Sequence, residues 1–210
     1  MRRSRAAGRG GERSPKPGQI RKKRALPAYL TPREKDDFFS VITSARDRAL
    51  FRLLYHHGLR VSEIGKLQLS DYRKGPSLDM DRLRITALKG SVSGEAAVVQ
   101  ECAKAMRQWL RIRGNAPGPL FPSRMKSPVN RRTIWKMMKT YSALAGLPAE
   151  KSHPHCWKHT CGTHLVSEQK ESIIDVQKHL RHADIRSTMI YVQLADEAGG
   201  NRAKRLKDWK

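Results

Sequence analysis

The stretch that decides the fold is Leu53-Leu54-Tyr55-His56-His57-Gly58-Leu59-Arg60-Val61-Ser62-Glu63. Its first half completes a predicted helix over Ala45–His57, and Gly58 is typical of the residue that ends such a helix. A new helix begins directly after Arg60, so the chain reverses there. Glu63 follows three residues later and is close enough to hold the guanidinium of Arg60. Spacing alone favours an ordinary surface ion pair.

Helical periodicity continues on both sides of this turn. The capping box Thr31-Pro32-Arg33-Glu34 predicts a helix that runs to about Ser44. Further helices are expected at about Val61–Leu67, Glu101–Arg113, Asn130–Ala145, His155–Ser167, Ser172–Leu180 and Ile185–Tyr191.

Only one short region has the pattern of strands. Arg82–Leu88 alternates and Glu95–Val99 is β-prone, with Lys89–Gly94 as the hairpin turn between them. Ser70–Asp81 is rich in turn residues, and Asn115–Pro128 is a proline-rich loop. The predicted fold class is therefore mainly α with a small β-hairpin or sheet, an α+β arrangement.

The charge indicates a polyanionic partner. The 210 residues include 43 Lys and Arg against 19 Asp and Glu, a formal net charge of +24. Nucleic acid is the default partner for such an excess. Three cysteines make no disulfide framework, which favours a reducing compartment. No run of 18 apolar residues occurs, so we expect no membrane partner.

The charge also suggests how the chain is divided. Residues 1–28 hold ten Lys and Arg and one Glu with few large apolar residues, which is typical of a disordered basic arm. Residues 29–195 form the predicted folded domain, and 196–210 a basic C-terminal tail. The arm carries +9 and the last ten residues +4, so 24 − 9 − 4 leaves +11 on the body.

A second cluster of titratable residues is His153-Pro154-His155-Cys156-Trp157-Lys158-His159, at a predicted helix start. With Cys161 it could suggest zinc, but no paired C-x2-C or H-x3-H motif has a second half elsewhere. We therefore expect no metal. His155 and Lys158 are three residues apart and share a helix face.

The third unusual stretch is Leu180-Arg181-His182, which is followed nine residues later by Tyr191. By itself this pattern is equally typical of a core tyrosine with its hydroxyl at the rim.

Read together, these blocks resemble the tyrosine recombinase (phage integrase) family over about Leu30–Leu194. Four blocks occur in the family's order: the Arg60 stretch, Lys89-Gly90 in the hairpin turn, His155-x-x-Lys158-His159-Thr160, and Leu180-Arg181-His182 followed by Tyr191. The resemblance implies a tyrosine recombinase catalytic domain without the usual N-terminal core-binding domain. This layout is similar to the small recombinases that invert promoter segments.

The resemblance implies a role for each residue. Tyr191 would attack a DNA phosphorus and form a 3′-phosphotyrosyl link, and His155 would take its proton. Arg60 would bind the nonbridging oxygens. Lys89 would protonate the leaving 5′-hydroxyl, and His182 would hydrogen-bond the phosphate. Supporting roles fall to His159 and to Glu63, which would orient Arg60 or the neighbouring histidine rather than touch DNA. The bond energy stays in the phosphotyrosine, so neither metal nor ATP nor another cofactor is expected.

One position departs from the family, because its second arginine is Lys158 here. Lysine keeps the charge and loses the planar two-pronged grip. Two interpretations stay open: a working enzyme adjusted to lysine, which we favour because the other positions are filled, or an inactive DNA-binding relic or regulator. A type IB-like topoisomerase would use the same residues. An RNA-binding protein is less well supported because aromatics make up only 6% of the chain.

The expected partner is double-stranded DNA. The best candidate to enter a groove is the helix Asn130–Ala145, through Arg131, Arg132, Lys136 and Lys139, although these could equally form a solvated basic face. The resemblance implies a homo-oligomer, a tetramer on paired DNA sites. It also implies a cytoplasmic, nucleoid-associated protein.

Overall fold

The computed structural model describes residues 26–86 and 92–199, with side chains described up to residue 197. Its helices are α1 (Pro32–Ser40), α2 (Ala45–His57), α3 (Val61–Ile64), α4 (Gln100–Arg113), α5 (Arg131–Leu144), α6 (His155–Ser167), α7 (Ile173–His179) and α8 (Ile190–Gly199). The strands are β1 (Tyr72–Arg73), β2 (Arg82–Ile85) and β3 (Gly94–Ala97). The predicted fold class is confirmed: the protein is mainly helical with one small sheet.

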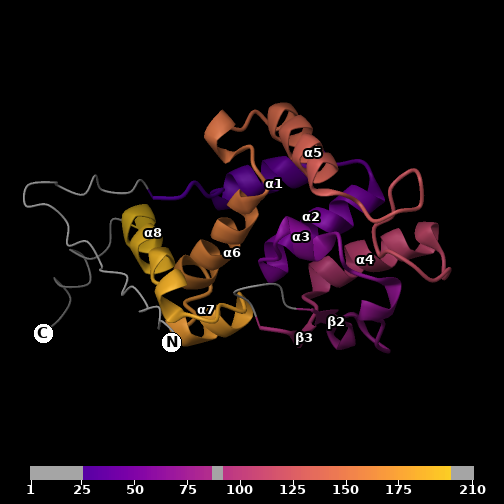
Figure 1. The fold of residues 1–210 in the computed structure, drawn as a ribbon. Helices are drawn as coiled ribbons and strands as arrows, with labels where there is room; N and C mark the ends of the chain where they lie inside the picture. The colour runs from indigo at the N-terminus through magenta and orange to yellow at the C-terminus, as the bar shows by residue number, and fades with distance from the viewer. Residues whose placement is uncertain (1–25, 87–91, 200–210) are drawn as a thin grey trace, which may run out of the picture.

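Helix α6 joins the two parts of the molecule (Figure 1). On one side lie α1 to α5 and the sheet, and on the other α7 and α8 pack against α6. Helices α2 and α6 also lie against each other. The C-terminal ends of α2 and α7 both lie against the first part of α6, because Lys158 bonds the carbonyls of Gly58 and Leu180.

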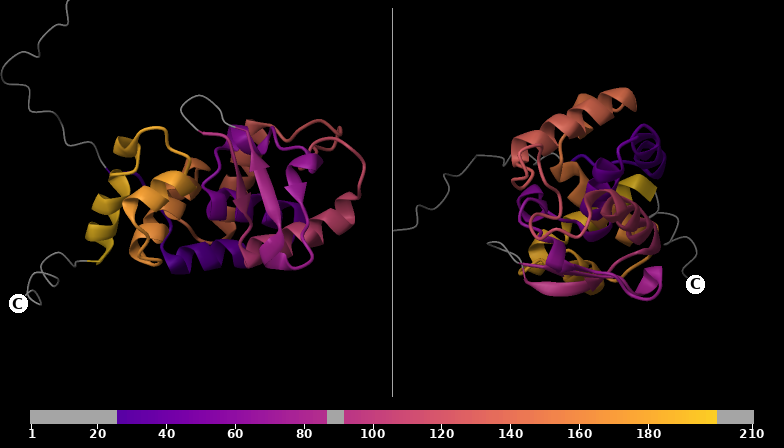
Figure 2. Two further views of the ribbon diagram at one scale, coloured as in Figure 1. Left: turned by 90° about the horizontal axis from the view of Figure 1, so that it is seen from below. Right: turned by 90° about the vertical axis from the view of Figure 1, so that its right-hand side faces the viewer.

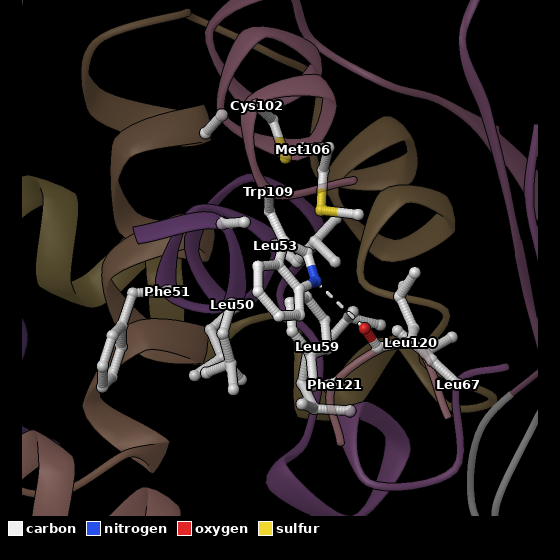
Figure 3. Close-up of a cluster of buried hydrophobic side chains, with 14 of the residues drawn as sticks. Leu50, Phe51, Leu53, Leu59, Leu67, Cys102, Met106, Trp109, Leu120 and Phe121 are labelled. Carbon is white, nitrogen blue, oxygen red and sulfur yellow. Dashed lines mark hydrogen bonds between the residues drawn. The ribbon is translucent and has the colours of Figure 1, made fainter. Parts of the chain in front are cut away.

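The main core lies around α2 and α4 (Figure 3). Leu50, Leu53 and Leu59 are almost fully buried against Met106 and Trp109. The Trp109 indole nitrogen donates a hydrogen bond of 3.0 Å to the Leu120 carbonyl, which ties the proline-rich loop to α4. Burial of each such side chain stabilises the fold by about 2 kcal/mol.

The sheet has three antiparallel strands in the order β1-β2-β3, one more than the predicted hairpin. The extra strand lies within Ser70–Asp81, where the sequence predicted only turns. Tyr72 pairs with Leu83 across the sheet, and its hydroxyl donates to the buried Asp81 carboxylate. A strand of two residues shows no alternation, so only its tertiary partners define it.

Three predicted helix ends were wrong. Helix α1 ends at Ser40, and Ser44 instead caps α2 by accepting from the Asp47 amide. Helix α3 ends at Ile64, and the Gly65 amide caps it by donating to the carbonyls of Glu63 and Val61. The last helix does not close at Tyr191, since α8 begins at Ile190 and continues to Gly199.

The C-terminal part has a smaller core of its own, formed by Cys161, Val176, Leu180, Tyr191 and Leu194. Leu26 and Tyr29 pack against it, so the chain has joined the fold by residue 26. The predicted arm and tail lie mostly outside the described residues, and those boundaries stay predictions. Figure 2 shows α7 and α8 at one end of the molecule. No helix in the described ranges has the length and apolarity needed to cross a membrane.

Candidate active site

Arg60 is held at the junction between α2 and α3. Gly58 adopts φ 53° at the C-terminus of α2, a conformation that suits glycine and reverses the chain. The Glu63 carboxylate accepts from the Arg60 backbone amide at 2.7 Å and lies 3.4 Å from its guanidinium. Glu63 is only 2% exposed. The pair is therefore partly internal, and the surface ion pair favoured by spacing alone is wrong.

A small cleft opens beside Arg60. It has a volume of about 270 Å³ and is lined by residues from three segments: Leu59, Arg60, Val61, Ser62, Arg131, Trp135, Pro154 and His155. The exposed His155 begins α6 on one wall, and Arg131 begins α5 on another. This cleft thus brings together three of the residues predicted from sequence, each from a different helix junction.

Lys158 points inward, although it shares helix α6 with the exposed His155. Its side chain is 3% exposed, and its ammonium donates to the carbonyls of Gly58 at 3.2 Å and Leu180 at 3.1 Å. Burial and the positive charges of Arg60 and Arg181 lower the pKa of Lys158 to about 8. The ammonium is therefore a fixed charge with two of its three donors used inside the protein.

His182 follows a tight turn after α7. Its Nδ1 lies 2.9 Å from the Thr188 hydroxyl, which fixes the ring orientation. Burial, with smaller contributions from Lys158 and Arg60, lowers the pKa of His182 to about 4. The ring is neutral near pH 7 and accepts or donates hydrogen bonds without carrying charge.

Tyr191 packs directly onto α6. Its ring stacks on His182 with centroids 6.3 Å apart, and a Cβ on Gly162 would come within 2.6 Å of it. The Tyr191 hydroxyl lies 3.5 Å from Nδ1 of His159, whose pKa burial lowers to about 4. Burial raises the pKa of Tyr191, while the charge of Arg60 acts in the opposite direction. At 2% exposure the residue faces protein, not solvent.

The imidazoles form a short series from the hydroxyl to the cleft. The rings of His159 and His155 meet edge to face at 4.7 Å, and His155 lines the cleft with Arg60. Although His155 is exposed at the cleft, partial desolvation of its ring by the surrounding protein, followed by the charge of Lys158, also lowers the pKa of His155. The series offers neutral proton acceptors on the path between Tyr191 and the cationic cleft.

The overall electrostatic character of this site is positive. Arg60, Lys158 and Arg181 surround the single carboxylate of Glu63. Among the described residues, three positive charges around one carboxylate give this group a net positive charge, which suits an anion with several oxygens. Within residues 26–86 and 92–199, no three or more His, Cys, Asp or Glu side chains are grouped as metal ligands.

The structure thus brings together Arg60, Glu63, Lys158, His182 and Tyr191, with His155 and His159 alongside. Lys89 lies outside the described residues. The four α5 cations, Arg131, Arg132, Lys136 and Lys139, are all exposed. Arg131 turns toward the cleft, whereas the other three share a face, since they lie within about 60° of one another at 100° per residue.

Sequence reasoning missed two contributors to this site. Arg181 is buried with φ 55°, a left-handed conformation that leaves no local signature in the sequence. Gly162 has ordinary helical surroundings in the sequence, and only the nearby Tyr191 ring explains why it lacks a side chain.

Comparison with known proteins adds the following similarities. The model of the phage integrase family matches residues 29–198. Tyrosine recombinase XerD of Haemophilus influenzae is 31% identical over 194 residues, which are 87% of this chain and 62% of that protein. Tyrosine recombinase XerC of Xylella fastidiosa strain M23 is 34% identical over 177 residues, 81% of this chain and 58% of that protein. The chain therefore spans less than two thirds of the length of these relatives.

Solved structures agree on the fold. The crystal structure of XerA recombinase superposes with a TM-score of 0.76 at 24% identity, covering 91% of this chain and 67% of that one. XerH site-specific recombinase, bound to palindromic difH substrate after cleavage, gives a TM-score of 0.72 at 22% identity, with 88% and 54% covered.

Proposed function

Because the chain belongs to the phage integrase family, we propose that it is a site-specific DNA recombinase that cuts and rejoins DNA through Tyr191. The observation that carries the proposal is that the Tyr191 hydroxyl lies 3.5 Å from Nδ1 of His159, whose ring contacts His155, in positive surroundings formed by Arg60, Lys158 and Arg181. A phosphodiester being attacked develops negative charge on its equatorial oxygens, which fixed cations stabilise.

The phosphate belongs in the cleft beside Arg60. There the guanidinium binds the nonbridging oxygens, with its position held by Glu63. Lys158 contributes its remaining donor and its charge, and His182 hydrogen-bonds an oxygen as charge builds. The weaker grip expected from lysine at position 158 is consistent with an ammonium shared with two carbonyls.

The phenol must lose its proton as it attacks. Tyr191 is buried against His159 in the DNA-free protein, so its ring has to leave that contact to reach a phosphate in the cleft. His155 lies at the cleft and takes the proton as Tyr191 forms its bond to phosphorus. The 5′-oxygen of the deoxyribose departs and receives a proton from Lys89, so no cofactor, metal or ATP enters the balance.

The helix α5 supplies the DNA-binding face. Arg131 touches the scissile region from the cleft, while Arg132, Lys136 and Lys139 reach the neighbouring phosphates or groove. We further propose that the protein acts as a tetramer on paired DNA sites and that it is nucleoid-associated in the cytoplasm.

The C-terminal tail is proposed to join neighbouring subunits. Deleting Asn201–Lys210 should then leave cleavage but abolish synapsis, and unchanged recombination would reject that role for the tail.

The test is a covalent adduct. Incubation with supercoiled DNA carrying candidate sites should give a protein–DNA species that survives denaturant and disappears in Tyr191→Phe. Lys158→Arg is measured beside the wild type. If the wild type forms no adduct with any substrate and Lys158→Arg does, the working-enzyme proposal fails at Lys158. Equal relaxation of plasmids with and without a site would indicate a topoisomerase.

A second candidate function is DNA binding without cleavage. The observation that favours it is the Lys158 ammonium, which is engaged by two backbone carbonyls in place of a family arginine. This alternative predicts that Tyr191→Phe leaves the biological effect on DNA intact, whereas the recombinase proposal predicts its complete loss.

A further inference from the structure

Two buried cations join the same two segments of backbone. The Lys158 ammonium bonds the carbonyls of Gly58 and Leu180, at 3.2 and 3.1 Å. The Arg181 guanidinium bonds the preceding carbonyl in each segment, those of His57 and His179, both at 3.1 Å. The two cations thus bridge consecutive carbonyls at the end of α2 to consecutive carbonyls at the end of α7.

The backbone of Arg181 has a conformation that is unusual for an arginine. It has φ 55°, a left-handed value that an arginine adopts only when its surroundings enforce it. The residue is 9% exposed, and its Nε and Nη2 are buried without a hydrogen-bond acceptor within 26–86 and 92–199. Nη2 lies 3.6 Å from the Glu63 carboxylate, so the guanidinium faces the carboxylate that orients Arg60.

Both bridged segments lead directly to residues of the phosphate site. Gly58 lies two positions before Arg60, and Leu180 lies two positions before His182. Glu63 is shared, because one guanidinium comes from Arg60 at 3.4 Å and the other from Arg181 at 3.6 Å. Arg181 therefore contacts the carboxylate that orients Arg60, so removal of its charge would alter how Glu63 holds the Arg60 guanidinium.

We propose that Arg181 is a positioning residue for cleavage, acting with Lys158 as a two-cation clamp that fixes the positions of Arg60 and His182 relative to each other. This rests on the proposed function. The clamp divides between two side chains the charge and donors that a single arginine at position 158 would offer. Arg181 itself does not touch DNA, since its free donors are buried.

The decisive variant is Arg181→Gly, because glycine adopts φ 55° without strain and the backbone is not disturbed. Arg181→Asn is a second variant whose side chain also tolerates this conformation. The matched control is Arg186→Gln, which removes one positive charge five residues away from an exposed pair with Asp184. All three are purified as the full chain and compared with the wild type by circular dichroism and thermal melting.

Two readouts are measured. Amide hydrogen exchange should rise at residues 58–60 and 180–182 in Arg181→Gly and stay unchanged in Arg186→Gln. Single-turnover adduct formation on a nicked duplex should slow about tenfold or more in Arg181→Gly, the scale of losing a preorganised electrostatic contact. The duplex Kd should change by no more than about twofold, since Arg181 is not expected to touch DNA.

A rescue experiment distinguishes a positioning role of Arg181 from a general loss of stability. Adding Lys158→Arg to Arg181→Gly should restore most of the lost rate, because a guanidinium carries five donors for the carbonyls and the phosphate. A wild-type rate in Arg181→Gly, or a double variant no faster than Arg181→Gly, would overturn the clamp while leaving Tyr191 chemistry intact. If even the wild type forms no adduct, the proposed function fails. The clamp has a test that does not need cleavage: equal amide hydrogen exchange in Arg181→Gly and Arg186→Gln would overturn it.

Discussion

The Tyr191 hydroxyl lies 3.5 Å from Nδ1 of His159, one helical turn away from His155. The contact is long for a hydrogen bond, and both groups are largely buried. Tyr191 thus lies against the neutral imidazole of His159 inside the protein, whereas His155 lines the cleft that contains Arg60. In the proposed reaction the phenol would therefore leave its contact with His159 and react in the cleft beside His155.

The two histidines should therefore differ when replaced. His155→Gln should slow single-turnover adduct formation about 100-fold, the usual scale for losing a general base. His159→Gln keeps a hydrogen-bonding side chain beside the resting hydroxyl and should slow it only a few-fold. The measurement is the rate of single-turnover adduct formation by both variants on the same nicked duplex. A larger loss in His159→Gln would indicate that His159, not His155, is the base.

Lys158 should give the reaction an alkaline limit. With a pKa of about 8 in the free protein, its ammonium loses its charge as the pH rises through this value. We expect kcat/KM for cleavage to fall above pH 8 in the wild type. In Lys158→Arg the guanidinium stays charged, so the fall should shift to higher pH. Identical alkaline limits in the two proteins would show that another group sets it.

Lys158 should also make the free energy of unfolding depend on pH. Its pKa is lowered from about 10.5 when unfolded to about 8 when folded, so the unfolded chain holds more protons between these values and folding stability rises with pH. Relative to Lys158→Met, which does not titrate, the wild type should gain about 2 kcal/mol in free energy of unfolding between pH 8 and 10. Urea melts at a series of pH values measure this difference, and no gain would place the ammonium in solvent.

Gly162 should be intolerant of even one methyl group. A Cβ there would come within 2.6 Å of the Tyr191 ring, so Gly162→Ala must displace the ring or α8. Overpacking costs about 1–3 kcal/mol, partly offset by the better helix propensity of alanine. Thermal melting and adduct formation should both fall. The control is Gly94→Ala in β3, where a Cβ meets nothing within 4 Å and adduct formation should be unchanged.

Salt dependence should identify the DNA-binding face. Each phosphate contact contributes about 0.9 to the slope of log K against log salt concentration. Replacing Arg132, Lys136 or Lys139 singly by Gln should reduce the slope by about one unit for each side chain that touches a phosphate. The control is Arg111→Gln, an equally exposed charge on α4. Equal changes on both helices would mean that α5 is an ordinary solvated face.

Local patterns were enough for much of the fold. The bounds of α2 follow from its apolar face and from Gly58, and α6 has the predicted bounds although apolar residues lie on all of its sides. Helix α5 begins where predicted because the Asn130 side chain accepts from the Thr133 amide. Such features depend on neighbours within one helical turn, which a sequence displays directly. The predicted ends of α1 and α8 were wrong because the same signals, a polar cap and a short amphipathic turn, fit more than one boundary.

The sequence by itself singled out the residues proposed to carry the chemistry, because the order and types of Arg60, His155, His182 and Tyr191 resemble those of the family. Only the tertiary structure decided that Lys158 faces the ends of α2 and α7, that Arg181 is buried in a left-handed conformation, and that Tyr191 rests on His159. The physical reason is distance along the chain. The Lys158–Gly58 and Arg181–His57 hydrogen bonds join residues 100 and 124 positions apart, and they exist only because packed cores bring these helix ends together.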